Sequence, residues 1–245
     1  MLKKIKDKLY FLKSWYQILF RYPQNTLNPR GLIYDDYWKE KRGDAVGALS
    51  DWQKIRADLI IRSLGKGNET SIGDIGCGGG ATLAYLGKNI RLVQSTGYDV
   101  SDFALDKVKS LGFEAIKMDV SADGELEKVK KTDHLLLLEV LEHLPHSEKV
   151  LATAYEKSRR GIFFSFPNSG FFIYRLRLLF GKFPMQWRVY PNEHLRFWTV
   201  ADLKWWLRAQ GYTEYDIFFY KGIPLLNRLW PSLFAAGLFV CLTKR

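Results

Sequence analysis

The chain has 245 residues and a formal net charge of +11, and 47% of its residues are hydrophobic and 15% aromatic. This composition excludes a disordered or fibrous protein. A chain of this length can bury one sizeable core, so we expect a single main domain. Two cysteines are too few for the disulfide framework of a small secreted protein, and they favour a reducing compartment. The positive charge indicates an anionic partner: a phosphorylated substrate, an acidic lipid surface or a nucleic acid.

Residues 2–20 carry apolar side chains at three- and four-residue steps and predict an amphipathic helix. Six of the first 24 residues are basic and a single one is acidic. Such a helix suits a peripheral contact with a membrane surface, and it equally suits packing on the domain or on a second subunit. We assign residues 1–49 to this helix and its lead-in. The sequence has no run of roughly 20 apolar residues to span a bilayer, so we expect a cytoplasmic protein, with the membrane contact open.

From residue 50 onward, helical patterns alternate with short β-rich runs. Residues 50–64 predict a helix, with Trp52, Ile55 and Ile60 on one face. Alternation of this kind predicts a parallel sheet that is covered by helices on both faces. We therefore assign residues 50–245 to one α/β domain. The expected strands are residues 71–75, 95–99, 115–118, 134–138 and 161–166.

The sequence changes character after the fifth expected strand. Residues 168–198 are aromatic, basic and interrupted by glycine and proline, which is typical of a cap or long loop inserted over a sheet. Thr199 and Asp202 form a capping-box pattern that predicts the start of a helix. The apolar runs at residues 215–220 and 233–242 predict a closing antiparallel hairpin.

A glycine-rich segment (DIGCGGG, residues 74–80) lies between the first expected strand and a helical pattern. Glycine lets the backbone turn sharply and lets a ligand approach it without a Cβ in the way. The spacing differs from the dinucleotide-binding fingerprint, which disfavours a dehydrogenase. The expected ligand-binding positions are Asp74, Gly76, Cys77, Gly78 and Gly80, with the Cys77 side chain packed inside.

Acidic residues follow the next two expected strands. Asp99 lies 21 residues after Gly78, where nucleotide-binding βαβ units carry a ribose-binding carboxylate, and Val100 follows it. The alternative for Asp99 is a helix-capping aspartate. Asp119 and Val120 end the third expected strand and suit the edge and face of an adenine ring, whereas the alternative is a turn aspartate.

Together these segments resemble the motifs of the class I S-adenosylmethionine-dependent methyltransferases. The resemblance rests on residues 74–80, 97–99 (GYD), Asp119 and 138–143 (LEVLEH), the last being similar to ubiquinone-biosynthesis-type O-methyltransferases. It implies a Rossmann-like sheet of strand order 3-2-1-4-5-7-6 with strand 7 antiparallel, to which this chain adds an N-terminal helical extension and a cap between strands 5 and 6. It also implies S-adenosyl-L-methionine as the cofactor, with Glu139 near its amino-acid portion.

A narrower resemblance covers residues 162–200. The segments 165–168 (SFPN), 175–184 and 192–195 (NEHL) resemble MetW-type methionine-biosynthesis proteins. The Glu-His pair after the fourth expected strand and the basic N-terminal helix depart from that family. The resemblance therefore supports a related fold, and it offers an alternative function: an S-adenosylmethionine-binding accessory protein that regulates a partner enzyme.

Methyl transfer to oxygen needs a group that removes the proton of the acceptor. His143 follows the fourth expected strand and is the first candidate, against a histidine satisfied by backbone hydrogen bonds. His194, on the cap side, is the second candidate and could contact the acceptor. Glu142, His143 and His146 offer ligand atoms, but no Cys/His spacing closes a metal site, so we expect none.

The favoured function is methyl transfer, expected at oxygen, to a small acceptor that is anionic or lipid-linked. An RNA acceptor is disfavoured, because no recognised RNA-binding module accompanies the charge. The sequence leaves the oligomeric state open. Four basic residues of the cap either bind an acidic group of the acceptor or form a solvated face: Arg175, Arg177, Lys182 and Arg188.

Overall fold

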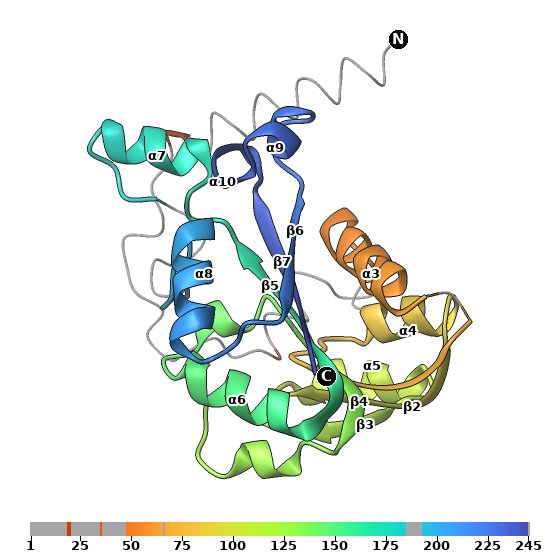
Figure 1. Ribbon diagram of the computed structural model, residues 1–245. Coiled ribbons are helices and arrows are strands. Elements are labelled where there is room, and N and C mark those ends of the chain that lie inside the picture. Colours follow the sequence, from red (N-terminus) through yellow and green to blue (C-terminus); the bar gives the residue numbers. More distant parts are fainter. Residues whose placement is uncertain (1–18, 21–34, 36–47, 66, 185–192, 245) are drawn as a thin grey trace.

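The computed structural model describes residues 19–20, 35, 48–65, 67–184 and 193–244, whose strands form one seven-stranded sheet (Figure 1). The strand order is β3-β2-β1-β4-β5-β7-β6. The first five strands pair in parallel, and β7 runs antiparallel to both β5 and β6. The fold expected from the sequence is therefore confirmed. The strands are β1 (Glu69–Ile75), β2 (Arg91–Asp99), β3 (Glu114–Lys117), β4 (Thr132–Leu138), β5 (Ser158–Pro167), β6 (Tyr215–Tyr220) and β7 (Gly237–Thr243).

Two helix starts follow directly from the sequence. At the first, the Ser50 side chain accepts a hydrogen bond from the Gln53 N–H, and the Gln53 side chain accepts one from the Ser50 N–H. Thr199 and Asp202 form the second, as predicted. The helices are α3 (Asp51–Leu64), α4 (Ala81–Gly87), α5 (Asp102–Ser110), η2 (Glu125–Lys128), η3 (Leu141–His143), α6 (Ser147–Lys157), α7 (Phe172–Leu179), α8 (Val200–Ala209), α9 (Leu226–Leu229) and α10 (Pro231–Phe234).

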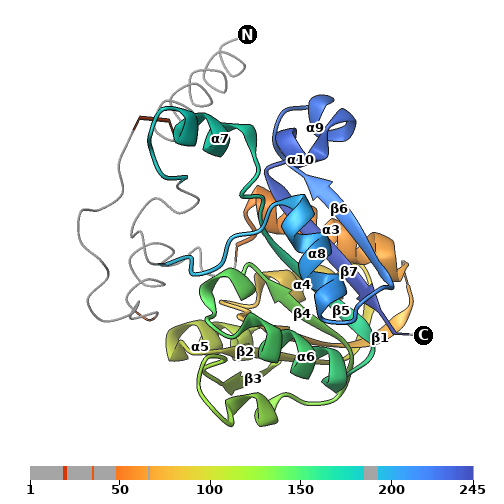
Figure 2. The same ribbon diagram turned by 60° about the vertical axis from the view of Figure 1, so that its left-hand side comes forward.

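Helices cover both faces of the sheet, with α3 and α4 on one side and α6 and α8 on the other (Figures 1 and 2). The central strand β4 serves both layers because successive side chains of a strand point to opposite faces. Leu135 and Leu137 belong to the core shared with α6 and α8, and Leu136 belongs to the core shared with α3 and α4. All three leucines are fully buried. The apolar run at the fourth expected strand thus reflects a strand covered on both faces.

The closing hairpin differs from the prediction in one respect. β6 and β7 pair as expected, but β7 begins at Gly237, whereas the sequence predicted a strand from residue 233. Residues 226–234 instead form the short helices α9 and α10. Pro231 stands at the first position of α10, where its fixed backbone angle and missing N–H favour a helix over a central strand.

The predicted helix at residues 2–20 and most of its lead-in to residue 49 lie outside the described residues. Leu19 and Phe20, which are described, are helical. Among the helices of the described part, none combines the length and the apolar character needed to cross a bilayer.

Candidate active site

The glycine-rich loop after β1 turns back against the end of β2. The N–H groups of Gly76 and Cys77 both donate to the carbonyl oxygen of Tyr98, at 2.8 and 3.1 Å. Gly76 has a φ of 73°, and a Cβ there would lie 2.6 Å from the Val140 side chain. Gly76 therefore has to be glycine, both for its left-handed backbone and for the close approach of the turn after β4.

The Cys77 side chain points away from the open side of the loop. It packs with Leu105 and Val108 of α5 in a small buried cluster, and burial raises the pKa of its thiol well above the ordinary value. The predicted packing of this thiol is confirmed. Cys77 can therefore meet a ligand in this loop only through its backbone.

Asp99 ends β2 with its carboxylate directed at the loop. One carboxylate oxygen accepts a hydrogen bond from the Gly78 N–H at 2.8 Å, and the other accepts one from the Ser101 N–H at 3.0 Å. The side chain that caps α5 is that of Ser101, which accepts from the Ala104 N–H. The helix-capping alternative for Asp99 is therefore wrong. Val100, next in the chain, is partly buried.

Asp74 lies beneath the same loop and is 3% exposed. Burial and the nearby charge of Asp99 raise the pKa of Asp74 to about 8, while the positive charge of Arg56 opposes the shift. Two buried carboxyl groups thus stand side by side at the ends of β1 and β2. With this pKa the Asp74 carboxyl is protonated near neutral pH, so it can donate a hydrogen bond to a ligand as well as accept one.

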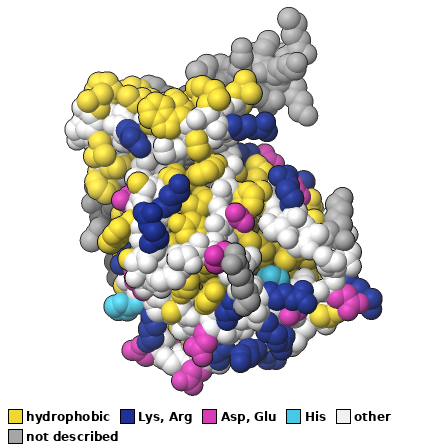
Figure 3. Space-filling view, in the orientation of Figure 1, with side chains coloured by type: hydrophobic (Ala, Val, Ile, Leu, Met, Phe, Trp, Pro, Cys, Tyr) yellow, Lys and Arg dark blue, Asp and Glu magenta, His cyan; other side chains and the backbone are white. Residues whose placement is uncertain are grey.

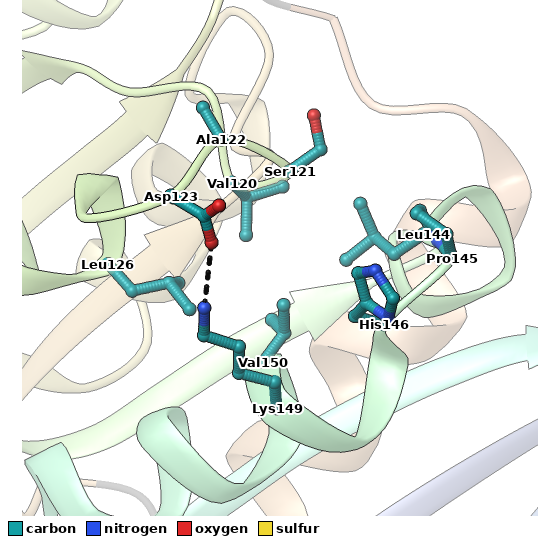
Figure 4. A pocket seen from close by; sticks show the side chains of 10 residues that line it. All are labelled: Val120, Ser121, Ala122, Asp123, Leu126, Leu144, Pro145, His146, Lys149 and Val150. Atoms are coloured by element: carbon teal, nitrogen blue, oxygen red, sulfur yellow. Dashed lines mark hydrogen bonds and ion pairs between the residues drawn. The ribbon is translucent and has the colours of Figure 1, made fainter.

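The third strand end has a more open structure. Asp119 is exposed, and its Oδ1 accepts hydrogen bonds from the N–H and the hydroxyl of Ser121, at 2.9 and 2.6 Å. This is the geometry of a turn aspartate. Val120 is partly buried and lines the pocket drawn in Figure 4, across which Asp123 and Lys149 form an ion pair of 2.9 Å. The pocket has room for about one water molecule, so it is no binding cavity for a cofactor.

Glu139 sits immediately after β4 with a φ of 59°, a conformation unusual for a side chain of this size. Its Oε1 accepts hydrogen bonds from the hydroxyls of Ser165 and Tyr220, at 2.9 and 3.1 Å, and pairs with the Arg56 guanidinium at 3.1 Å. Several elements thus hold this turn: α3, β5 and β6 each supply one partner. The strained turn and its network fix where the chain after β4 goes.

Arg56 and Tyr220 are site residues that the sequence analysis missed. Arg56 had a detectable signal, because it lies at four-residue steps between Trp52 and Ile60, inside the apolar stripe of α3. An arginine at 6% exposure needs a buried anionic partner, and Glu139 is that partner. Tyr220 gave no such signal, since aromatic residues are ordinary in a strand.

The structure brings the two candidate catalytic histidines together. Their rings lie 4.7 Å apart between centroids, at an interplanar angle of 88°. The Nδ1 of His143 hydrogen-bonds the carbonyl oxygen of Glu193 at 2.7 Å. A carbonyl can only accept, so Nδ1 carries the hydrogen and Nε2 of the neutral ring is unprotonated. Burial lowers the pKa of His143, and burial together with His143 lowers the pKa of His194 to about 3. Both rings are neutral at physiological pH.

Glu142 completes this group of side chains. Its backbone carbonyl accepts from the N–H groups of Leu195 and Arg196, at 2.8 and 3.1 Å, which fastens the cap segment to η3. One ligand atom from each of Glu142, His143 and His194 lies within 4.8 Å of the others. The first and last of these residues are 52 positions apart in the sequence, so the local spacing used to predict that no metal site exists could not reveal this group.

The basic residues of the cap have structural partners. Arg175 donates to the Gly170 carbonyl at 2.7 Å. Arg177 is 2% exposed and donates to the carbonyls of Phe183 and Leu19, at 2.9 and 3.0 Å. A solvated face, one of the two alternatives, is therefore wrong for Arg177, which ties α7 to Leu19 and Phe183. Binding of the acceptor by the basic residues stays a prediction. Arg188 lies outside the described residues.

The fold agrees with that of a known protein family. The family model described as "Methyltransferase domain" matches residues 50–215, more than half of the chain, and the chain belongs to this family. Family, strand order and glycine loop together define a class I S-adenosylmethionine-dependent methyltransferase. No curated protein matches significantly in sequence.

Solved structures with the same fold share few identical residues with the chain. A SAM-dependent methyltransferase from Archaeoglobus fulgidus has a TM-score of 0.59 and 18% identity, covering 87% of this chain and 100% of its own. A possible histamine N-methyltransferase from Thermotoga maritima has a TM-score of 0.55 and 17% identity over 86% of this chain and 94% of its own. Magnesium protoporphyrin IX methyltransferase from Synechocystis PCC 6803, solved with bound SAH, has a TM-score of 0.55 and 15% identity over 86% and 98%.

Proposed function

We propose that the chain transfers the methyl group of S-adenosylmethionine to an oxygen atom of a small acceptor that is anionic or lipid-linked. The observation that best supports this proposal is the position of the Asp99 carboxylate, which is buried at the end of β2 and accepts a hydrogen bond from the Gly78 N–H of the glycine loop. A carboxylate in this position accepts hydrogen bonds from both hydroxyls of a ribose.

The other residues at the strand ends would contact different parts of the cofactor. Gly76, Gly78 and Gly80 have positive φ angles, and Gly76 is the one of the three that is exposed to a ligand. We place the adenine ring along the open strand ends near Asp119 and Val120, outside the small pocket, because the turn hydrogen bonds of Asp119 use its Oδ1 and leave Oδ2 for the edge of the ring. The amino-acid portion would lie toward Glu139.

The two histidines lie where the proton of the acceptor hydroxyl would be removed. The neutral His143 ring has an unprotonated Nε2, since its Nδ1 hydrogen is directed to the Glu193 carbonyl. Such a lone pair either takes a proton directly or holds a cation that acidifies the hydroxyl. Both routes generate the oxygen nucleophile beside the carboxyl ends of the strands, where ligands bind in open α/β sheets.

An exposed apolar rim supports a lipid-linked acceptor. We define the rim as Leu178, Leu179, Phe180, Leu229 and Trp230, each between 57% and 80% exposed. These residues belong to α7 and α9 or adjoin them, at the same end of the molecule, where hydrophobic side chains gather in the space-filling view (Figures 1 and 3). Such a patch on a folded domain is typical of a binding surface.

The rim is continuous with the carboxyl ends of the strands. Asn168, directly after β5, donates to the carbonyls of Ser232 and Ala235 at 3.3 and 2.8 Å. The rings of Phe172 in α7 and Phe234 in α10 lie 5.8 Å apart. A lipid chain that binds to the rim would therefore place its polar head near the carboxyl ends of the strands, where the site lies.

The cofactor assignment predicts a binding defect in Asp99→Ala. Two hydrogen bonds from ribose hydroxyls to a charged acceptor contribute about 1.5–3 kcal/mol each. Calorimetric titration should therefore show an affinity for S-adenosylmethionine and S-adenosylhomocysteine at least about 100-fold weaker than in the wild type. The control is Asp102→Ala, three residues away on the exposed start of α5, which should bind normally. Wild-type affinity in Asp99→Ala, with intact circular dichroism, would refute the assignment.

The rim predicts binding to lipid. The full chain should float with vesicles that contain an anionic phospholipid, and the double variant Leu179→Glu/Leu229→Glu should float at least several-fold less. Both leucines are more than 75% exposed, so the substitutions should change stability by less than about 0.5 kcal/mol. Val93→Glu, at an exposed position of β2, is the matched control. A chain that begins at Asn25 would measure how much residues 2–20 contribute to vesicle binding. Equal flotation of the wild type and the double variant would exclude the rim as a lipid contact.

A further inference from the structure

The Glu142 carboxylate is buried without a hydrogen-bond partner. The residue is 1% exposed, and neither carboxylate oxygen has a partner among the described residues. The Arg56 guanidinium is paired with Glu139. An unpaired buried carboxylate costs several kcal/mol, so this position favours a cation.

The two histidines present suitable ligand atoms to the same point. The unprotonated Nε2 of His143 lies 4.0 Å from Glu142 Oε1. Its Nδ1 donates to the Glu193 carbonyl at 2.7 Å, which is the outer-shell hydrogen bond that orients a metal-binding imidazole. His194 stands perpendicular to His143 on the facing segment.

We propose that Glu142, His143 and His194 bind one divalent transition-metal cation. This assignment rests on the proposed methyl transfer to oxygen and specifies how the acceptor proton is removed. The three ligand atoms lie within 4.8 Å of one another. In a tetrahedral site with metal–ligand bonds of about 2.0–2.2 Å, two ligand atoms lie roughly 3.3–3.6 Å apart. Binding therefore requires the most distant pair to approach by up to about 1.5 Å, which rotation of the side chains on the two facing segments would have to supply.

The ligand set selects the class of metal. Two imidazoles and one carboxylate suit Zn²⁺, Mn²⁺, Fe²⁺ or Co²⁺, whereas Mg²⁺ and Ca²⁺ prefer oxygen ligands alone. Three protein ligands leave a coordination position for a further oxygen, as in catalytic metal sites. Closed structural sites, by contrast, have four protein ligands.

The cation would act on the acceptor hydroxyl. Coordination lowers the pKa of a bound hydroxyl, and its proton passes to water. The resulting oxygen attacks the methyl carbon: the O–C bond forms as the C–S bond breaks, and the sulfonium becomes the neutral thioether S-adenosylhomocysteine. His143 and His194 then serve as ligands and do not accept the proton themselves.

The test is metal binding by the untagged full chain. Protein stripped with a chelator would be titrated with Zn²⁺ by calorimetry and with Co²⁺ by visible absorption. We expect one ion per chain, a cobalt spectrum typical of nitrogen ligands, and no displacement by millimolar Mg²⁺. Glu142→Gln and His194→Ala should each weaken Zn²⁺ binding by more than the roughly 10–100-fold lost with an outer-shell partner. His146→Ala, an exposed histidine outside the group, should bind as the wild type does.

Cofactor binding by the same variants separates this proposal from the proposed function. Glu142→Gln and His194→Ala should retain S-adenosylmethionine affinity, which also shows that they are folded, and Asp99→Ala should retain Zn²⁺. No Zn²⁺ or Co²⁺ binding, or equal binding by all the variants, would overturn the metal site and leave the methyltransferase assignment intact. A wild-type chain that does not bind S-adenosylmethionine would instead overturn the proposed function.

Discussion

Arg56→Ala is expected to lower the free energy of unfolding by about 3 kcal/mol, because it leaves the partly buried Glu139 carboxylate without its countercharge. The Arg56 side chain is 8% exposed and the Glu139 side chain 28%, so the loss falls at the low end of the range for buried ion pairs. The substitution also removes the hydrogen bond from the guanidinium to the Tyr220 hydroxyl, 3.3 Å long. Chemical denaturation followed by circular dichroism would measure the change.

Two further variants separate the ion pair from general effects on α3. Arg62→Ala removes an exposed arginine in the last turn of the same helix and should cost less than about 1 kcal/mol. The double variant Arg56→Met/Glu139→Gln replaces both charges, and it should be more stable than Arg56→Ala, because no unpaired charge is left. Arg56→Ala within 1 kcal/mol of the wild type would mean that Glu139 finds another partner.

The sheet was predictable because its signals are local. Runs such as residues 135–138 are apolar without alternation, as a strand covered on both faces requires. The glycine loop and Asp99 were predictable for a related reason: parallel strands end at one edge, so strand-end residues meet whatever the intervening chain does. The closing strand was overestimated because the apolar residues of α10 continue directly into β7.

The contacts across the site were not predictable in the same way. His143 and His194 were each selected as candidates, but their perpendicular contact depends on two hydrogen bonds between the Glu142 carbonyl and residues 195–196. The pairing of Arg56 with Glu139 likewise joins segments 83 residues apart through the packing of α3 on the sheet. Such pairings depend on tertiary packing, for which a single sequence provides no period or spacing.

His143→Ala should lower the turnover number for methyl transfer by about 10²–10⁴-fold, the usual contribution of a group on which removal of the acceptor proton depends, whether it takes the proton or holds the cation that acidifies the hydroxyl. The affinity for S-adenosylmethionine should remain within a few-fold of the wild type, because the glycine loop and Asp99 lie on other strands. Transfer of a labelled methyl group to an extract of lipids and small metabolites would measure turnover. His146→Ala is the matched control and should keep wild-type turnover.

The pH profile tests the role of His143 independently of folding. Burial lowers the pKa of His143, and the ring acts in its neutral form, which predominates above that pKa. The acidic limb of the wild-type profile should therefore fall below the ordinary histidine pKa of about 6.5, with turnover still near its maximum at that pH. His143→Ala should lose this limb as well as the rate. Unchanged turnover in His143→Ala would remove the histidine from the chemistry, and an acidic limb above pH 6.5 would contradict its neutral, buried state.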